Sequence, residues 1–390
     1  MKHNRSNLWK IYLYKFLSDF WLIAPIMIPF YKANHLSTTQ FFIVQSAYMA
    51  GVLVFEIPSG FFSDVIGRKK TLILGAFFIP IGLGVYAFTS GFAGFIAAEV
   101  ILSIGASMRS GTDSAFIYDT LLQLGEESQY PKSQGTADFY TRLGTSTSSI
   151  GGGLLALILI RLPFYVNIGS GVGLVILSLY LTEPQREKFS TENPFKDILK
   201  IVKYCITHAQ IRSLMLYTSL LLSTGIIGVW SYYIYYEELG LSIGLNGVLF
   251  ALFGLCSGFG ARHSHDLEGK LGHKKALFLL LVISAAFAAL GLGKSLFLIP
   301  VIFLAGFMWG FSGPMLLNYL NRLTGSEIRA TVLSVNSMAG NISFIILSPL
   351  FGAITDRYSL SAAYLAMAVY FLLAALLATF LLLKHRVIST

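Results

Sequence analysis

The sequence predicts an all-α membrane protein with twelve transmembrane helices arranged as two pseudo-symmetric six-helix halves. Three observations predict this fold. The chain of 390 residues is 55% hydrophobic and only 12% charged, and its mean hydropathy of +0.69 is too apolar for a soluble domain with a single core. The apolar residues fall in long stretches, and a charged turn near the start of the chain recurs in looser form in its second half.

Each apolar stretch is long enough to cross a bilayer, because about 20 helical residues span the hydrocarbon and satisfy their own backbone hydrogen bonds. The predicted spans are residues 8–31, 40–62, 71–89, 92–122, 135–159, 163–182, 212–236, 243–262, 275–293, 296–320, 330–354 and 361–383. They divide the chain into an N-terminal bundle (1–182), a cytoplasmic linker (183–211) and a C-terminal bundle (212–390). Apolar residues recur at helical spacing within the linker, which predicts an amphipathic surface helix there.

The basic residues predict the orientation. Most of the 28 Lys and Arg lie in the termini and in the loops of one side, whereas Lys32, Arg161, Lys294 and Arg357 fall on the other. Basic loops stay in the cytoplasm, so both termini should be cytoplasmic in a bacterial inner (cytoplasmic) membrane. The net charge of +9 then reflects topology. We expect a monomer whose partners are the lipid bilayer and a small-molecule substrate, and no nucleic acid.

The charged turn contains Gly60, Asp64, Gly67 and Arg68, followed by two lysines. It lacks the Gly-Lys-Ser/Thr ending of a phosphate-binding loop. Placed between the second and third of twelve spans, it resembles the corresponding turn of the major facilitator superfamily of secondary transporters. The stretches 56–60 and 110–119 further resemble a bacterial, drug-exporter-like branch. The looser copy, residues 260–275, has His273 in place of the arginine, which makes a clamp there doubtful.

The resemblance implies a transporter that alternates the access of a central site between two rocking halves. It also implies that Asp64 and Arg68 clamp the cytoplasmic ends of the halves, with Asp64 near the positive N-terminus of the helix that begins at about Arg329. A solvated turn that only sets topology is the alternative. The predicted conformational gate comprises Gly60, Asp64, Gly67, Arg68, Asp119, Asp138, Arg142 and Arg329.

Charged side chains inside spans are costly, and each is therefore a functional candidate. Asp19 lies near the middle of the first span, where it could carry a proton, or simply pair with Lys15 one turn away. Arg109 and Asp113 lie one turn apart in the fourth span, which predicts an ion pair that either serves transport or staples helices together. Glu99 shares their helix face but should be solvated near the outer end. The predicted proton-coupling residues are Asp19, Asp113 and Glu99.

The fifth span has a polar stripe and a glycine-rich stretch. Asp138, Arg142, Thr145 and Ser149 share one face, which favours a gate or a packing network over a ligand site. The glycines at 144 and 151–153 resemble the signature of drug/proton antiporters, although its Gly-Pro is absent. These glycines could equally allow close helix approach.

The predicted substrate cavity combines Asp19, Arg109 and Asp113 with the aromatic residues Trp230, Trp309 and Tyr319. We find no catalytic residues and no metal-ligand spacing, and expect no enzyme activity and no cofactor other than the proton gradient as energy source. The predicted function is proton-coupled export of a small organic molecule by antiport. The alternatives are proton-coupled uptake (symport) of a nutrient or a metal chelate such as a siderophore, and a non-transporting membrane sensor.

Overall fold

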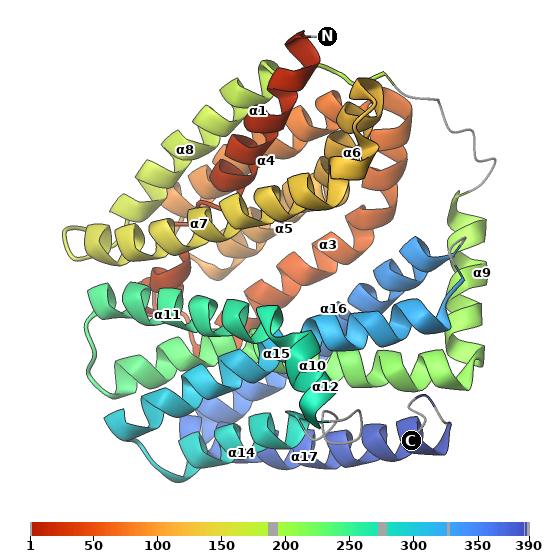
Figure 1. Cartoon of the computed structure of the whole chain (residues 1–390). Coiled ribbons are helices and arrows are strands. Elements are labelled where there is room, and N and C mark those ends of the chain that lie inside the picture. The colour runs from red at the N-terminus through yellow and green to blue at the C-terminus, as the bar shows by residue number, and fades with distance from the viewer. Residues whose placement is uncertain (1, 186–193, 272–278, 326–327, 386, 388–390) are drawn as a thin grey trace. The chain divides into compact units, whose positions relative to one another are not determined.

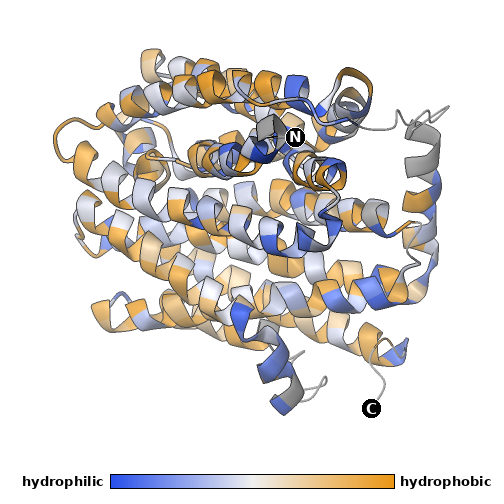
Figure 2. Ribbon diagram, turned by 45° about the horizontal axis from the view of Figure 1, so that its top comes forward, coloured by the Kyte–Doolittle hydropathy of each residue, from blue (hydrophilic) through white to orange (hydrophobic). Residues whose placement is uncertain are grey.

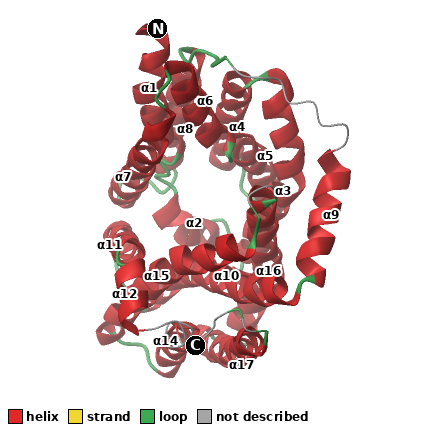
Figure 3. Cartoon of the chain, turned by 45° about the vertical axis from the view of Figure 1, so that its right-hand side comes forward, coloured by secondary structure: helices red, strands yellow, loops and turns green. Residues whose placement is uncertain are grey.

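The computed structural model of the chain describes residues 2–185, 194–271, 279–325, 328–385 and 387, and all regular elements among them are helices (Figure 3). The α-helices are α1 (Lys2–Ser18), α2 (Met27–Ala33), α3 (Thr38–Ile66), α4 (Arg68–Phe88), α5 (Phe92–Arg109), α6 (Thr112–Leu124), α7 (Tyr130–Ala156), α8 (Leu162–Leu179), α9 (Pro194–Thr207), α10 (Ala209–Glu238), α11 (Ile243–Arg262), α12 (Ser264–Leu271), α14 (Leu279–Leu292), α15 (Ile299–Leu323), α16 (Arg329–Arg357) and α17 (Leu360–Lys384).

Within the described residues, nine segments are long and apolar enough to cross a membrane. They are Thr38–Glu56, Arg68–Phe88, Phe92–Leu124, Leu162–Leu179, Ala209–Glu238, Ile243–Arg262, Leu296–Leu323, Thr331–Arg357 and Leu360–Lys384. Hydrophobic residues run along most of the helices (Figure 2). The predicted span 275–293 begins in residues that the structure does not describe, and the count of twelve stays a prediction.

The chain forms two compact units. Unit 1 comprises Met1–Leu36, Ala47–Glu192 and Ser242–Ala251, and unit 2 comprises Ser37–Ser46, Asn193–Leu241 and Leu252–Thr390. Most of the predicted N-terminal bundle therefore lies in unit 1 and most of the C-terminal bundle in unit 2. The first residues of α3 and of α11 are exceptions, since each belongs to the unit that holds mainly the other bundle.

In unit 1, α4 packs against α5 and α8, while α1 packs against α6, α7 and α8 (Figure 1). The contact of α4 with α5 is close because small residues face each other. A Cβ at Gly105 would lie 2.8 Å from the carbonyl oxygen of Gly75. Close backbone approach through glycine is the usual way in which membrane helices associate, because lipid supplies no hydrophobic drive between them.

Two predicted spans of unit 1 are interrupted, contrary to the expectation of continuous helices. The first span consists of α1, a turn over residues 19–23, a 3-10 helix (Ala24–Ile26) and α2. The fourth span breaks between α5 and α6, where Gly111 has a φ of +71°. Glycine adopts this left-handed conformation without the steric cost of a Cβ, and the chain can therefore change direction inside the apolar stretch.

In unit 2, α10 packs against α15, α16 and α17, and α14 packs against α15 and α17. Helix α9, which lies in the predicted linker, packs against α10 and α16. The start of α3 is capped by Asp356 of α16, whose carboxylate accepts hydrogen bonds from the backbone N–H groups of Thr38 (3.0 Å) and Thr39 (2.7 Å). This acidic side chain from another helix adds to a local capping box, in which the Ser37 hydroxyl accepts from the N–H of Gln40 (3.2 Å) and Oε1 of Gln40 accepts from the N–H of Ser37 (3.0 Å).

Candidate functional site

A cluster of charged side chains surrounds the two helix breaks of unit 1. Lys15 of α1 and Asp113 of α6 form an ion pair, with 2.6 Å between Nζ and Oδ2, and their side chains are only 16% and 13% exposed. We expected Asp113 to pair with Arg109, and a pair of Lys15 with Asp19 was one of two alternatives for Asp19. The structure differs because the chain breaks at Gly111, so Arg109 and Asp113 no longer lie one turn apart on a single helix. The break also brings the first turn of α6, which contains Asp113, to α1.

Arg109 instead contacts the end of α1. Its Nη1 donates to the carbonyl oxygen of Ser18 at 3.1 Å, and its Nε donates to the carbonyl oxygen of Gly105 at 3.2 Å. The hydroxyl of Ser18 donates to Oδ2 of Asp19 at 2.8 Å. Arg109 and the Asp19 carboxylate are therefore both held by Ser18. Two cationic and two anionic side chains, all from unit 1, are thus brought together around the breaks.

Glu99 lies in a different environment from the one expected. It is only 6% exposed, whereas the sequence indicated a solvated residue. The hydroxyl of Tyr86 donates to its Oε1 at 2.6 Å, and the Tyr31 hydroxyl lies 2.6 Å from that of Tyr86. The rings of Phe30, Phe95 and Phe164 pack around these tyrosines. Glu99 is buried because aromatic side chains of α2, α4, α5 and α8 pack together around its carboxylate.

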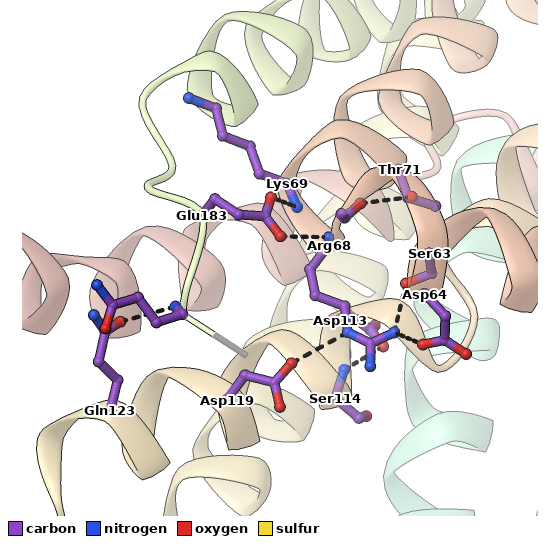
Figure 4. A network of polar contacts seen from close by, with 12 residues as sticks. Ser63, Asp64, Arg68, Lys69, Thr71, Asp113, Ser114, Asp119, Gln123 and Glu183 are labelled. Atoms are coloured by element: carbon purple, nitrogen blue, oxygen red, sulfur yellow. Dashed lines mark hydrogen bonds and ion pairs between the residues drawn. The ribbon is translucent and has the colours of Figure 1, made fainter. Parts of the chain in front are cut away.

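The predicted gate residues at the charged turn form one network (Figure 4). Arg68 Nη1 donates to Asp64 Oδ1 at 2.7 Å and to the Ser63 hydroxyl at 2.8 Å, and its Nε donates to Asp119 Oδ2 at 3.2 Å. Arg68 thus ties the end of α3 to α6. The guanidinium of Arg68 binds carboxylates of two helices at once, which fixes its position and favours a defined geometry over a solvated turn.

Glu183 is a member of this network that the sequence analysis missed. Its two carboxylate oxygens accept hydrogen bonds from the backbone N–H groups of Arg68 (2.7 Å) and Lys69 (2.8 Å), at the start of α4. Gly67, with a φ of +113°, makes room for this contact, since a Cβ there would lie 2.8 Å from the carboxylate. An acidic cap is favourable at a helix N-terminus because of the helix dipole.

Replacing Glu183 by alanine should lower the stability of the protein by about 1–2 kcal/mol, because two N–H groups of α4 lose their acceptor. The measurement is the midpoint of thermal unfolding in detergent. Gln185→Ala is the matched control, since residue 185 is exposed in the same segment. Equal midpoints for the two variants would refute the capping role.

The polar stripe of α7 is only partly buried. Asp138 and Arg142 are exposed, with Asp138 accepting from Gln134 at 3.0 Å, while Ser149 is buried and donates to the Thr145 carbonyl at 2.6 Å. The glycines of α7 allow close approach to the first span. A Cβ at Gly144 would lie 2.4 Å from the Phe16 carbonyl oxygen, and one at Gly152 would lie 1.8 Å from that of Leu22.

The predicted aromatic cavity residues lie in unit 2. Trp309 covers Gly225, at which a Cβ would lie 2.1 Å from the indole Nε1, and stacks on Phe253 with 6.4 Å between ring centroids. Trp230 packs edge-on against Phe41 at 5.4 Å. Both tryptophans are partly exposed, as a ligand contact requires. Tyr319 is buried instead, and its hydroxyl donates to Glu268 of α12.

Three predictions for the charged turns and the gate remain untested. Much of the looser second copy, including Gly272 and His273, lies outside the described residues. The predicted clamp between Asp64 and the helix that begins at Arg329 would join the two units, and it stays a prediction. Within unit 2, Arg329 Nη2 donates to the Thr324 carbonyl oxygen at 3.4 Å. Gly60 is exposed in α3, and its role in the gate also stays a prediction.

The class of protein follows from this architecture of long apolar helices with a charged turn at Gly67. The model of the Major Facilitator Superfamily matches residues 16–264 and 213–389. The chain therefore belongs to the major facilitator superfamily, and it is a multi-pass membrane protein of a transporter family.

Individual relatives are distant. The uncharacterized MFS-type transporter YxaM of Bacillus subtilis (strain 168) is 24% identical over 379 residues, which cover 92% of this chain and 91% of the relative. Multidrug resistance protein 2 of the same organism is 24% identical over 190 residues, which cover 47% of this chain and 46% of the relative. The crystal structure of the nucleoside transporter NupG matches with a TM-score of 0.79 and 13% identity over 98% of this chain and 99% of that one; this likeness shows the fold alone.

Proposed function

We propose that the protein is a proton-coupled secondary transporter that exports a small organic molecule by antiport. The observation that carries the proposal is the cluster of Lys15, Asp19, Arg109 and Asp113 at the two helix breaks of unit 1. Ionisable groups are expensive inside a membrane and are kept there for ion or substrate pathways. The similarity of part of the chain to a multidrug resistance protein supports export over uptake.

Asp19 is the proton carrier in this proposal. The carboxylates of the cluster differ in their partners, because Asp113 is held by the ammonium group of Lys15, whereas Asp19 accepts from the hydroxyl of Ser18. We assign the binding and release of the proton to Asp19, and we assign to the ion pair of Asp113 with Lys15 the role of holding α6 to α1. Glu99, bonded to Tyr86, is a second protonatable group.

The substrate is an organic molecule with an apolar or aromatic part. Trp230 and Trp309 of unit 2 are partly exposed and offer ring faces for it, which suits stacking with planar groups. We place the protein as a monomer in the bacterial inner membrane with both termini in the cytoplasm, as the basic loops favour.

The test uses purified protein in liposomes that hold a pH-sensitive dye. An imposed pH gradient is combined with a panel of drugs, siderophores, sugars, nucleosides and amino acids. Antiport predicts substrate-dependent proton movement opposite to the substrate. Movement in the same direction would overturn export and support proton-coupled uptake. Substrate binding without any flux would overturn transport and favour the sensor.

A further inference from the structure

The break in the first span leaves backbone groups that need new partners. In a continuous helix, the N–H of Leu22 would donate to the carbonyl oxygen of Ser18, four residues earlier. In the structure the turn over residues 19–23 replaces this pattern. The N–H of Phe20 donates to Leu17 (3.3 Å) and that of Trp21 donates to Asp19 (3.1 Å). Lipid offers no partner for such groups, so an interruption at this depth needs support from the protein.

Asn167 of α8 supplies that support. Its Oδ1 accepts from the N–H of Leu22 at 2.9 Å, and its Nδ2 donates to the carbonyl oxygen of Phe20 at 2.7 Å. The side chain is 2% exposed. The Ser170 hydroxyl accepts from Nδ2 at 2.9 Å, which fixes the amide with its oxygen toward Leu22. One buried amide thus replaces the missing helical bonds on both sides of Trp21.

This arrangement has a consequence for Arg109. Because Asn167 takes the N–H of Leu22, the carbonyl oxygen of Ser18 accepts from the guanidinium of Arg109. A continuous helix would direct the Leu22 N–H to that same oxygen. The guanidinium is thereby kept beside the residue whose hydroxyl binds Asp19.

We propose that Asn167 is a positioning residue for proton coupling: by holding the first span open at Leu22, it keeps the Ser18 carbonyl available to Arg109 and so sets the electrostatic environment of Asp19. This inference rests on the proposed role of Asp19 as the proton carrier. Asn167 contacts neither the proton nor the substrate, and it acts through the backbone of the break.

The charged and titratable groups near Asp19 belong to several helices. They are Tyr14 and Lys15 of α1, Tyr48 of α3, Glu99 and Arg109 of α5, Asp113 of α6, and Tyr130 and Asp138 of α7. Asn167→Ala leaves all of these in place. It removes only the amide that binds the backbone of Phe20 and Leu22, so the effect of the amide can be measured separately from that of the charges.

Trp21 lies inside the break and provides a readout that needs no substrate. The full-length chain with Trp9, Trp230 and Trp309 replaced by phenylalanine is titrated with acid, and the fluorescence of Trp21 is followed. Asp19→Asn should abolish the transition. Asn167→Ala should move its midpoint by about one pH unit, because the guanidinium of Arg109 is then no longer held at the Ser18 carbonyl. Ser178→Ala, also buried in α8 and bonded only within its own helix at Val175, should leave the midpoint unchanged.

The outcomes separate the two proposals. A transition that survives Asp19→Asn overturns Asp19 as the proton carrier. A transition that Asp19→Asn abolishes but that has the same midpoint in Asn167→Ala and Ser178→Ala overturns only the role of Asn167. If Asn167→Ala does not fold, Ser170→Ala is titrated instead, since it removes the hydroxyl that orients the amide. A smaller shift of the midpoint is then expected, and an unchanged midpoint counts against the inference.

Discussion

Replacing Asp19 by asparagine is expected to abolish substrate accumulation driven by a pH gradient, at least ten-fold below the unmodified protein, while substrate binding persists. Asparagine keeps the size and the acceptor oxygen that the Ser18 hydroxyl contacts, but it cannot bind and release a proton. The bound substrate therefore still triggers alternation, and the coupling to the gradient is lost. Accumulation is measured in liposomes with an imposed pH gradient, and binding is measured in detergent.

The matched control is Glu127→Gln, which neutralises an exposed carboxylate in the short 3-10 helix Glu127–Gln129 of the same unit and should transport normally. Asp19→Asn should also retain exchange of labelled for unlabelled substrate, a reaction that needs no net proton movement. Gradient-driven accumulation at the normal level in Asp19→Asn would remove Asp19 from the coupling mechanism. Loss of binding together with accumulation would assign Asp19 to the substrate site instead.

Gly152→Ala is expected to lower the yield of folded protein sharply. The added Cβ would lie 1.8 Å from the carbonyl oxygen of Leu22, and the obstacle is backbone in the interrupted first span. Overpacking of a well-packed interior typically costs about 1–3 kcal/mol, and more where the neighbour cannot move. The backbone of Leu22 is held by Asn167, so the clash can be relieved only if the whole turn over residues 19–23 moves. The measurement is the fraction of the extracted protein that is monodisperse in detergent, together with the midpoint of thermal unfolding of that fraction.

The neighbouring glycine provides the control for this experiment. A Cβ at Gly151 would meet only the end of the Leu22 side chain, at 3.2 Å, which can rotate away. Gly151→Ala should therefore fold nearly as well as the unmodified protein. If both alanine variants behave alike, close approach of α7 to the first span is not the reason for a glycine at residue 152.

The apolar stretches of the sequence predicted the helical fold, because a membrane helix depends on local composition. The charged turn with Asp64 and Arg68, placed between two of these stretches, indicated the family. The breaks could not be predicted in the same way. Within the predicted span 8–31, the residues that follow Asp19 in the turn are all apolar and give no sign of a break. The amide that stabilises this turn comes from Asn167, far along the chain. A lone asparagine within the apolar stretch 163–182 was the available signal.

The pairing of charges also depends on the break. Arg109 and Asp113 have the spacing of an ion pair on a continuous helix, and Gly111 removes that helix. The cap of α4 is likewise provided at long range, by Glu183, and local sequence rules for helix starts do not reveal it. At the start of α3, the long-range contact of Asp356 adds to the capping box of Ser37 and Gln40, which local rules do reveal. The charged turn was different, since Asp64 and Arg68 are four residues apart and interact as local spacing predicts.

The composition of the charged cluster bears on how the membrane voltage acts. In the proposed transport cycle, Lys15 and Arg109 are cationic and Asp19 and Asp113 are anionic when no proton is bound. The formal charges then cancel, and a reorientation that carries the unprotonated cluster moves no net charge. A proton on Asp19 leaves one positive charge. Each elementary charge that crosses a potential of 100 mV changes in energy by about 2.3 kcal/mol. An inside-negative potential would thus speed the inward passage of the protonated form and leave the unprotonated return unaffected.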